Sequence, residues 1–229
     1  MATIRRHHLA ALAAALFAFG AAPAGATAAT HVNLRVEGPA HTIVASNPQA
    51  FVGQVNGHNL ARPTVLGGLI TATSNHDIPL DLQWFDCCGF FVNSIDGVAA
   101  DATHYWAFKI GRRLAALGAG ETPASDRRIL FYYTSFDPVT FETQPTLNLT
   151  STPRAIGHGG QVRFTVTGYD DFGNGTREAG ARVWEQGRIV GRTDADGRAT
   201  LTFPRAGAYP VRATFAGTIR SQRLWVTVS

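Results

Sequence analysis

Residues 84–109 read WFDCCGFFVNSIDGVAADATHYWAFK and concentrate the rarest chemistry of the chain. They hold both cysteines, two of the four tryptophans and the only lysine, Lys109. Asp96-Gly97 in their middle is a typical two-residue hairpin turn, because such a turn requires positive φ angles. The aromatic and β-branched residues around it predict strands at 90–95 and 104–110. We expect these two strands to be neighbours in one sheet.

The segments before this stretch predict a hairpin and then a helix. Residues 31–37 alternate apolar and polar side chains, which indicates a strand with one buried face, and a second short strand follows at 41–46. Apolar residues over 64–73 have helical spacing, and Thr64 is a suitable N-cap. Gly67-Gly68 weakens the helix, since each glycine costs about 1 kcal/mol relative to alanine.

Further strands are expected at 80–85 and 129–134, so the first part of the chain, 29–136, is predicted to be a small α+β domain. Residues 137–152 are rich in proline, threonine and serine and are predicted to be a linker. From 153 to 229, short alternating segments separated by turns favour an immunoglobulin-like β-sandwich. The predicted fold class is therefore mainly β.

Residues 1–28 have the layout of a secretory signal peptide. Arg5 and Arg6 precede an apolar run from Leu9 to Phe19, and Ala26-Thr27-Ala28 is a suitable cleavage site. The run is short for an uncleaved membrane anchor, and no later segment is long and apolar enough for a membrane span. We therefore expect a secreted, extracellular protein.

The charge of the chain is small for its length. The formal net charge is +4, and loss of the signal peptide, which removes two arginines and no acid, lowers it to +2. There is no cluster of lysine and arginine with interleaved aromatic residues, so nucleic acid is not an expected partner.

Cys87 and Cys88 are adjacent, which leaves three possibilities for their state. An exported protein with two cysteines usually forms a disulfide, and a bond between neighbours would need a strained peptide that its surroundings hold in place. The alternatives are a disulfide between two molecules, or two unpaired thiols. The sequence does not choose among them.

Five aromatic residues are candidates for an apolar ligand surface, with Tyr105 and Trp106 the most informative. Adjacent residues of a strand point to opposite faces, so at most one of these two belongs to the core and the other is exposed or covered at an interface. The full group expected at the ligand surface is Phe90, Phe91, His104, Tyr105 and Trp106.

No pattern in the sequence predicts a catalytic or metal site. The histidines are scattered without the spacing of metal ligands, and no Gly-x-Ser-x-Gly motif or phosphate-binding glycine loop is present. Asp194-Ala195-Asp196-Gly197 begins like a calcium loop but lacks its final acidic residue, so a hairpin turn is favoured. We therefore expect a protein that is not an enzyme and has no cofactor.

Residues 31–136 resemble the β-grasp-like domains related to the C-terminal β-domain of transcobalamin and intrinsic factor. The resemblance lies in VNLRVEG at 32–38, in FFVNSIDGV at 90–98 and in HYWAFKIGRR at 104–113. It implies a β-grasp-like fold and binding of a soluble ligand such as a corrinoid, with cobalamin as ligand. In that family a separate helical toroid completes the corrinoid site, and this chain has one predicted helix.

The second part of the chain is similar to bacterial immunoglobulin-like repeats of exported proteins. The matching stretches are GARV at 180–183, TDADGRA at 193–199 and GAY at 207–209. Such modules serve as spacers or adhesive units and imply no activity. Two functions are expected: a non-enzymatic extracellular binding module for a soluble ligand, or a structural or adhesive protein that acts through contacts with a surface protein.

Overall fold

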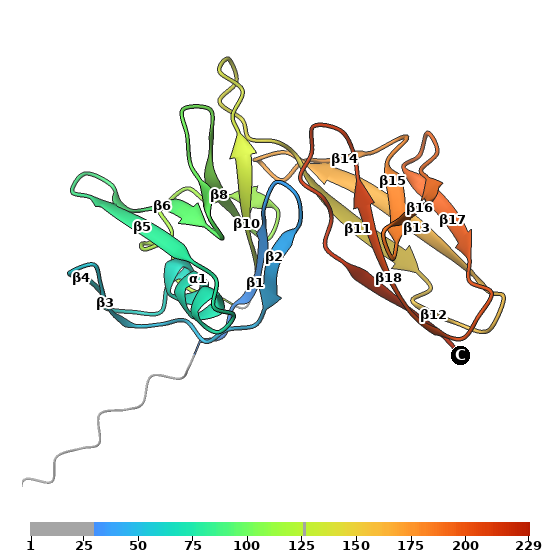
Figure 1. The fold of residues 1–229 in the computed structure, drawn as a ribbon. Coiled ribbons are helices and arrows are strands. Elements are labelled where there is room, and N and C mark those ends of the chain that lie inside the picture. The colour runs from blue at the N-terminus through green and yellow to red at the C-terminus, as the bar shows by residue number, and fades with distance from the viewer. Residues whose placement is uncertain (1–29, 126) are drawn as a thin grey trace, which may run out of the picture.

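The computed structural model describes residues 30–125 and 127–229. This part of the chain is mainly β, with several sheets, as the sequence predicts (Figure 1). Strands β1 to β10 and helix α1 form a first half, and strands β11 to β19 form a second half. The predicted signal peptide, residues 1–28, lies outside the described residues. Within them, no helix has the length and apolar character needed to cross a membrane.

The first half is built on a five-stranded sheet in the order β2-β1-β10-β8-β9. Its strands are β1 (Asn33–Glu37), β2 (Thr42–Ser46), β8 (His104–Ile110), β9 (Arg113–Leu114) and β10 (Arg128–Ser135). β1 runs parallel to β10, and the other neighbours are antiparallel. The predicted hairpin of β1 and β2 is confirmed.

The remaining elements of the first half are α1 (Val65–Ser74) and two small sheets, β3-β4 and β5-β6-β7. Their strands are β3 (Gly53–Val55), β4 (His58–Leu60), β5 (Leu80–Phe85), β6 (Gly89–Ile95) and β7 (Val98–Ala99). The expected pairing of β6 with β8 is wrong. The turn at Asp96-Gly97, with φ angles of 54° and 74°, returns the chain to β7 instead, so β6 and β8 belong to different sheets.

Thr64 is the N-cap of helix α1, as predicted, and its side chain accepts a hydrogen bond from the backbone N–H of Gly67 at 3.1 Å. Close packing explains why glycines occupy positions 67 and 68 inside the helix. A Cβ atom at Gly67 would overlap the carbonyl oxygen of Phe51, and one at Gly68 would overlap the side chain of Val32. The helix therefore lies closer to β1 and to the Phe51 backbone than any larger residue would allow.

One face of the five-stranded sheet, together with α1 and β5-β6, encloses the core of the first half. Alternate residues of each main strand point inward, which follows from the period of two along a strand. The inward residues of the sheet are Leu34, Val36, Trp106, Ile129 and Phe131, and α1 adds Val65, Leu66, Leu69 and Ala72.

The second half consists of two sheets. The first is ordered β11-β13-β14, with β17 also paired to β13; its strands are β11 (Thr146–Thr152), β13 (Gln161–Tyr169), β14 (Gly175–Arg177) and β17 (Arg198–Thr202). The second is ordered β12-β19-β18-β15-β16; its strands are β12 (Ala155–Ile156), β15 (Arg182–Glu185), β16 (Arg188–Arg192), β18 (Gly207–Thr214) and β19 (Leu224–Val228).

The two sheets share one core and are arranged like a sandwich. Leu149, Phe164 and Val166 of one sheet are buried together with Val183 and Val226 of the other. The predicted linker, 137–152, is too long. Its last seven residues form β11, which pairs with β13 along its whole length, because Leu147 and Leu149 are needed in this core.

The second face of the five-stranded sheet is covered by the second half. Ala107, Leu130 and Tyr132 point to this face and pack with Ile219. Glu37 and Lys109 point the same way, and their side chains are 1% and 0% exposed. The sequence indicates one buried face for β1, but both faces of the sheet are covered.

Lys109 is the centre of one polar contact between the halves. Its Nζ donates to the carbonyl oxygens of Tyr169 at 3.0 Å and Asp170 at 2.8 Å, and lies 3.2 Å from Oδ1 of Asp171. Asp171 also accepts hydrogen bonds from the backbone N–H and hydroxyl of Thr143. Burial lowers the pKa of Lys109, and the charge of Asp171 opposes that shift.

We expect Gly67→Ala to destabilise the protein although alanine is the better helix former. Propensity alone would raise the free energy of unfolding by about 1 kcal/mol, whereas overlap with the Phe51 carbonyl should cost more, about 1–3 kcal/mol. Urea denaturation followed by circular dichroism measures the difference. Ser74→Ala, at the exposed end of the same helix, should stay within about 0.5 kcal/mol. A stabilised Gly67→Ala variant would contradict the close packing.

Lys109→Met should lower the free energy of unfolding by about 3–5 kcal/mol, because it leaves the buried Asp171 carboxylate without its cation. Arg198→Met is the matched control. Arg198 forms an exposed ion pair with Asp196 at 3.3 Å, so its loss should cost no more than about 1 kcal/mol. Equal effects of the two substitutions in urea denaturation would show that Lys109 does not hold the halves together.

Candidate functional site

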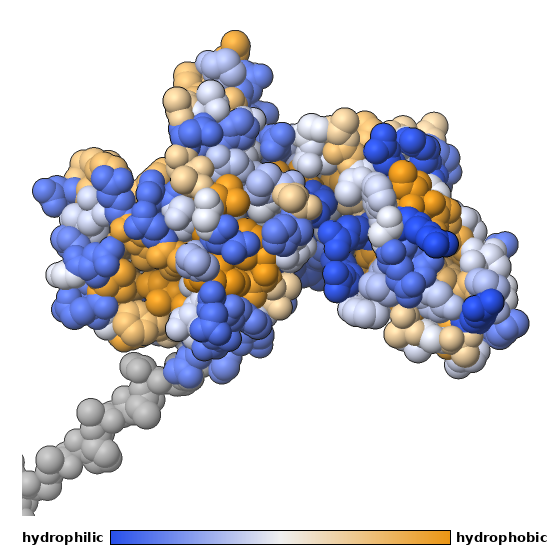
Figure 2. Space-filling model, viewed as in Figure 1, coloured by the Kyte–Doolittle hydropathy of each residue, from blue (hydrophilic) through white to orange (hydrophobic). Residues whose placement is uncertain are grey.

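A cleft of about 930 Å³ lies where the two halves meet. The first half contributes the turn between β1 and β2, with His104 of β8 and Tyr133 of β10. The second half contributes Trp184 of β15, Arg212 of β18 and the segment that follows β18. Figure 2 shows hydrophilic residues gathered around the junction of the halves. The volume is within the usual range of small-molecule sites.

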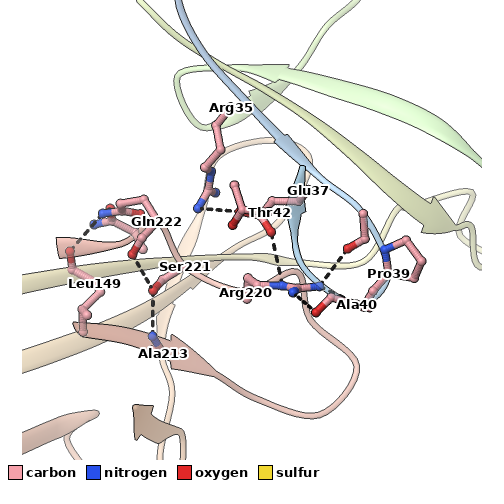
Figure 3. Close-up of polar contacts among 12 residues, drawn as sticks. Arg35, Glu37, Pro39, Ala40, Thr42, Leu149, Ala213, Arg220, Ser221 and Gln222 are labelled. Atoms are coloured by element: carbon pink, nitrogen blue, oxygen red, sulfur yellow. Dashed lines mark hydrogen bonds and ion pairs between the residues drawn. The ribbon is translucent and has the colours of Figure 1, made fainter. Parts of the chain in front are cut away.

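Arg220 fixes one side of the cleft by joining the halves. Its guanidinium donates to the carbonyl oxygens of Gly38 at 2.7 Å and Pro39 at 2.8 Å, and also to that of Ala40 (Figure 3). These three carbonyls belong to the turn between β1 and β2. The turn is therefore held against the second half in one conformation.

The carboxylate of Glu37 lies behind this turn and is shared by two arginines. Its Oε1 is 3.4 Å from Nη1 of Arg35 and accepts a hydrogen bond from the hydroxyl of Thr42 at 2.8 Å, and its Oε2 is 3.2 Å from Nε of Arg220. Burial raises the pKa of Glu37, and Arg35 opposes the shift. Burial also lowers the pKa of Arg35 and of Arg220, which Glu37 opposes. Two guanidinium groups share one carboxylate, so the cluster of Arg35, Glu37 and Arg220 has an excess of positive charge.

The segment that carries Arg220 is itself anchored to the second half. The hydroxyl of Ser221 accepts a hydrogen bond from the backbone N–H of Ala213 at 2.8 Å (Figure 3). The side-chain amide of Gln222 donates to Asn148 at 2.9 Å and to the carbonyl of Leu149 at 3.0 Å. Arg220 is thus presented from a fixed backbone rather than from a free loop.

Each half contributes aromatic side chains to its own wall of the cleft. The rings of His104 and Tyr133 are stacked, with centroids 5.4 Å apart, and the Tyr133 hydroxyl donates to the carbonyl of Ala99 at 2.9 Å. On the other wall, Nε1 of Trp184 donates to the hydroxyl of Thr214 at 2.8 Å. Both walls hold their rings through hydrogen bonds, so the ring orientations are set before any ligand arrives.

The residues expected at a ligand surface do not gather on one surface. Phe90 and Trp106 are 8% and 5% exposed and belong to the core of the first half, so their assignment to an exposed surface is wrong. Tyr105 is half-buried at the interface near Phe136, whereas Phe91 is exposed beside Phe85. Of the predicted group, only His104 lines the cleft.

Cys87 and Cys88 are joined by a disulfide, which is one of the three states left open by the sequence. Both are exposed in the turn between β5 and β6, and neither lines the cleft. In residues 30–125 and 127–229, no group of three or more histidine, cysteine, aspartate or glutamate side chains could hold a metal ion.

Most residues of the cleft could not have been found from the sequence. Trp184 and Arg212 occupy ordinary strand positions, and they become neighbours because they lie opposite each other on β15 and β18. Tyr133 lies within an apolar run that indicates only a buried strand. The one available signal was His104, through its place beside the aromatic residues of β8.

Replacing both cysteines with serine should lower the free energy of unfolding by no more than about 1 kcal/mol, because a bond between neighbours closes almost no loop of the unfolded chain. Urea denaturation measures this. The intact monomer should also be about 2 Da lighter before reduction than after it, the mass of two thiol hydrogens. A covalent dimer in non-reducing mass spectrometry would contradict the bond within one chain.

The sequence was compared with known proteins. No protein-family model matches the chain, and no curated protein sequence matches it either. A function must therefore be inferred from the geometry and chemistry of the residues themselves.

Proposed function

We propose that this protein is a secreted, non-enzymatic binding module that holds a soluble ligand in the cleft between its two halves. The observation that carries the proposal is that both halves build the cleft and that buried ion pairs fix them together. A cavity whose walls are set in advance costs a ligand little ordering on binding, which favours affinity.

The proposed folds are a β-grasp-like first half and an immunoglobulin-like second half. The strand order β2-β1-β10-β8-β9, with β1 parallel to β10 and one helix against the sheet, supports the first. Two sheets around one core, with β12 parallel to β19 at an edge, support the second. These folds alone assign no function.

The proposed ligand class includes corrinoids. A flat ring system could pack against Trp184 on one wall or against the stacked His104 and Tyr133 on the other. In this proposal the cleft takes the place of the surface on β6 and β8 that the aromatic residues of those strands predict. It is formed by a second β-rich half rather than by a helical toroid.

The polar groups of the cleft favour binding over catalysis. The hydroxyl of Thr214 accepts from Trp184, and that of Thr218 donates to the carbonyl of Phe215 at 3.0 Å. Neither is bonded to a base, and the ring nitrogen Nδ1 of His104 is occupied by Thr103 at 2.8 Å. A nucleophile needs a base within hydrogen-bond reach.

The second candidate is an adhesive or structural role, and one feature favours it. The connection between β10 and β11 projects from the molecule (Figure 1) and exposes 83% of Val139 and 74% of Phe141. Asp137 orders this turn by accepting hydrogen bonds from the backbone N–H groups of Val139 and Thr140. An ordered apolar tip is suited to contact with a surface protein.

Titration with cyanocobalamin should quench tryptophan fluorescence, and the protein should retain the corrinoid in ultrafiltration. Trp184→Ala should weaken binding about tenfold, the equivalent of about 1.4 kcal/mol. Trp225→Ala should leave it unchanged, because Trp225 is exposed on β19 outside the cleft.

Two outcomes would count against the proposal. Retention that survives Trp184→Ala would place the corrinoid elsewhere. Absence of retention, together with loss of partner or surface binding in a Val139→Ser, Phe141→Ser double variant, would favour the adhesive role instead.

A further inference from the structure

The side chains that line the cleft have an unbalanced charge. Among the residues that the structure describes, three arginines, Arg212, Arg220 and Arg223, line it, whereas no aspartate or glutamate does. The protein as a whole is only weakly basic. The positive charge of the cleft is therefore a local feature and not a reflection of the overall composition.

Arg220 already has an acidic partner, whereas Arg212 and Arg223 have none among the described residues. Arg220 pairs with Glu37 and with three carbonyl oxygens. The guanidinium groups of Arg212 and Arg223 make no hydrogen bond or ion pair with another residue in the described part of the chain. Arg212 is half-buried, which makes an unpaired cation there more costly than at the surface.

The carboxylates nearest to the cleft are engaged elsewhere. Glu37 is shared by Arg35 and Arg220 and is 1% exposed, and it forms no ion pair with Arg212 or Arg223. Asp101, near the wall formed by His104 and Tyr133, accepts hydrogen bonds from the hydroxyl of Thr103 and from two backbone N–H groups. In the described part of the chain no carboxylate forms an ion pair with Arg212 or Arg223, so both guanidinium groups are available to an external anion.

Arg212 lies beside an aromatic surface. Trp184 and Arg212 are directly opposite on the neighbouring strands β15 and β18, so their side chains leave the sheet on the same face. Hydrogen bonding to Thr214, also on β18, holds the indole in place. A cation next to a fixed ring suits a ligand that has a flat ring and an anionic group attached near that ring.

Building on the proposed function, we propose that the cleft binds an anionic ligand, whose phosphate or carboxylate group pairs with Arg212 and Arg223 while its ring packs against Trp184. A guanidinium group fits both oxyanions, because its N–H groups form two parallel hydrogen bonds to them. Burial of the anion would neutralise the two free arginines. A neutral ligand of the same shape would leave them unpaired.

Three probes with one ring system test the ligand class: 2-naphthyl phosphate, 2-naphthoate and the neutral 2-naphthol. Calorimetric titration of the full protein should show at least one of the two anions binding about tenfold or more tightly than 2-naphthol. The preferred anion distinguishes a phosphate ligand from a carboxylate ligand. Raising the salt concentration should lower the affinity for the anion and leave the affinity for 2-naphthol little changed.

Variants test the assigned residues. Arg212→Gln and Arg223→Gln should each reduce affinity for the preferred anion about tenfold, with little effect on 2-naphthol. Arg163→Gln is the matched control, because it removes the same charge from an exposed position of β13 outside the cleft, and it should have no effect. Circular dichroism of each variant shows whether the fold is retained.

The failure of this inference is distinct from that of the proposed function. If the three probes bind equally and Trp184→Ala weakens them all, the cleft is a binding site without preference for anions, and the inference is overturned. An equal loss of affinity for the anion in the Arg163→Gln and Arg212→Gln variants would also overturn the inference. If neither the probes nor cyanocobalamin bind, the proposed function fails as well.

Discussion

Two buried charges on one face of the five-stranded sheet determine how the two halves of this protein are held together. Lys109 is neutralised by Asp171, and Glu37 is neutralised in part by Arg220, both from the second half. Separation of the halves would leave each of these groups without its partner. A buried charge that loses its partner costs about 3–5 kcal/mol, so the relative position of the halves is strongly constrained.

The cleft follows from this arrangement. Arg220 ties the turn between β1 and β2 to a segment that Ser221 and Gln222 fix against the second half. Aromatic side chains of both halves line the space beside these contacts. Such a cavity is not a property of either half alone, because His104 and Trp184 belong to different sheets in different halves. A rigid junction is therefore more consistent with the proposed binding role than a flexible linker would be.

Local features were predictable where they depend on neighbouring residues. Thr64 caps α1, and Asp96-Gly97 forms a tight turn, because both depend on the chemistry of a few consecutive residues. Features that depend on distant contacts were not predictable. Phe90 and Trp106 were expected at a surface, but β5-β6 and α1 enclose them in one core. The end of the linker was misplaced for the same reason, since β11 is needed to complete the core of the second half.

The sequence by itself determined which residues share a face of each strand, because side chains alternate with a period of two. It therefore separated Leu34 and Val36 from Arg35 and Glu37, and Trp106 from Tyr105 and Lys109. Only the tertiary structure decided what covers each face. The face of the sheet that carries Glu37 of β1 and Lys109 of β8 is an interface and not a solvent face, since the second half supplies counter-charges that allow both to be buried.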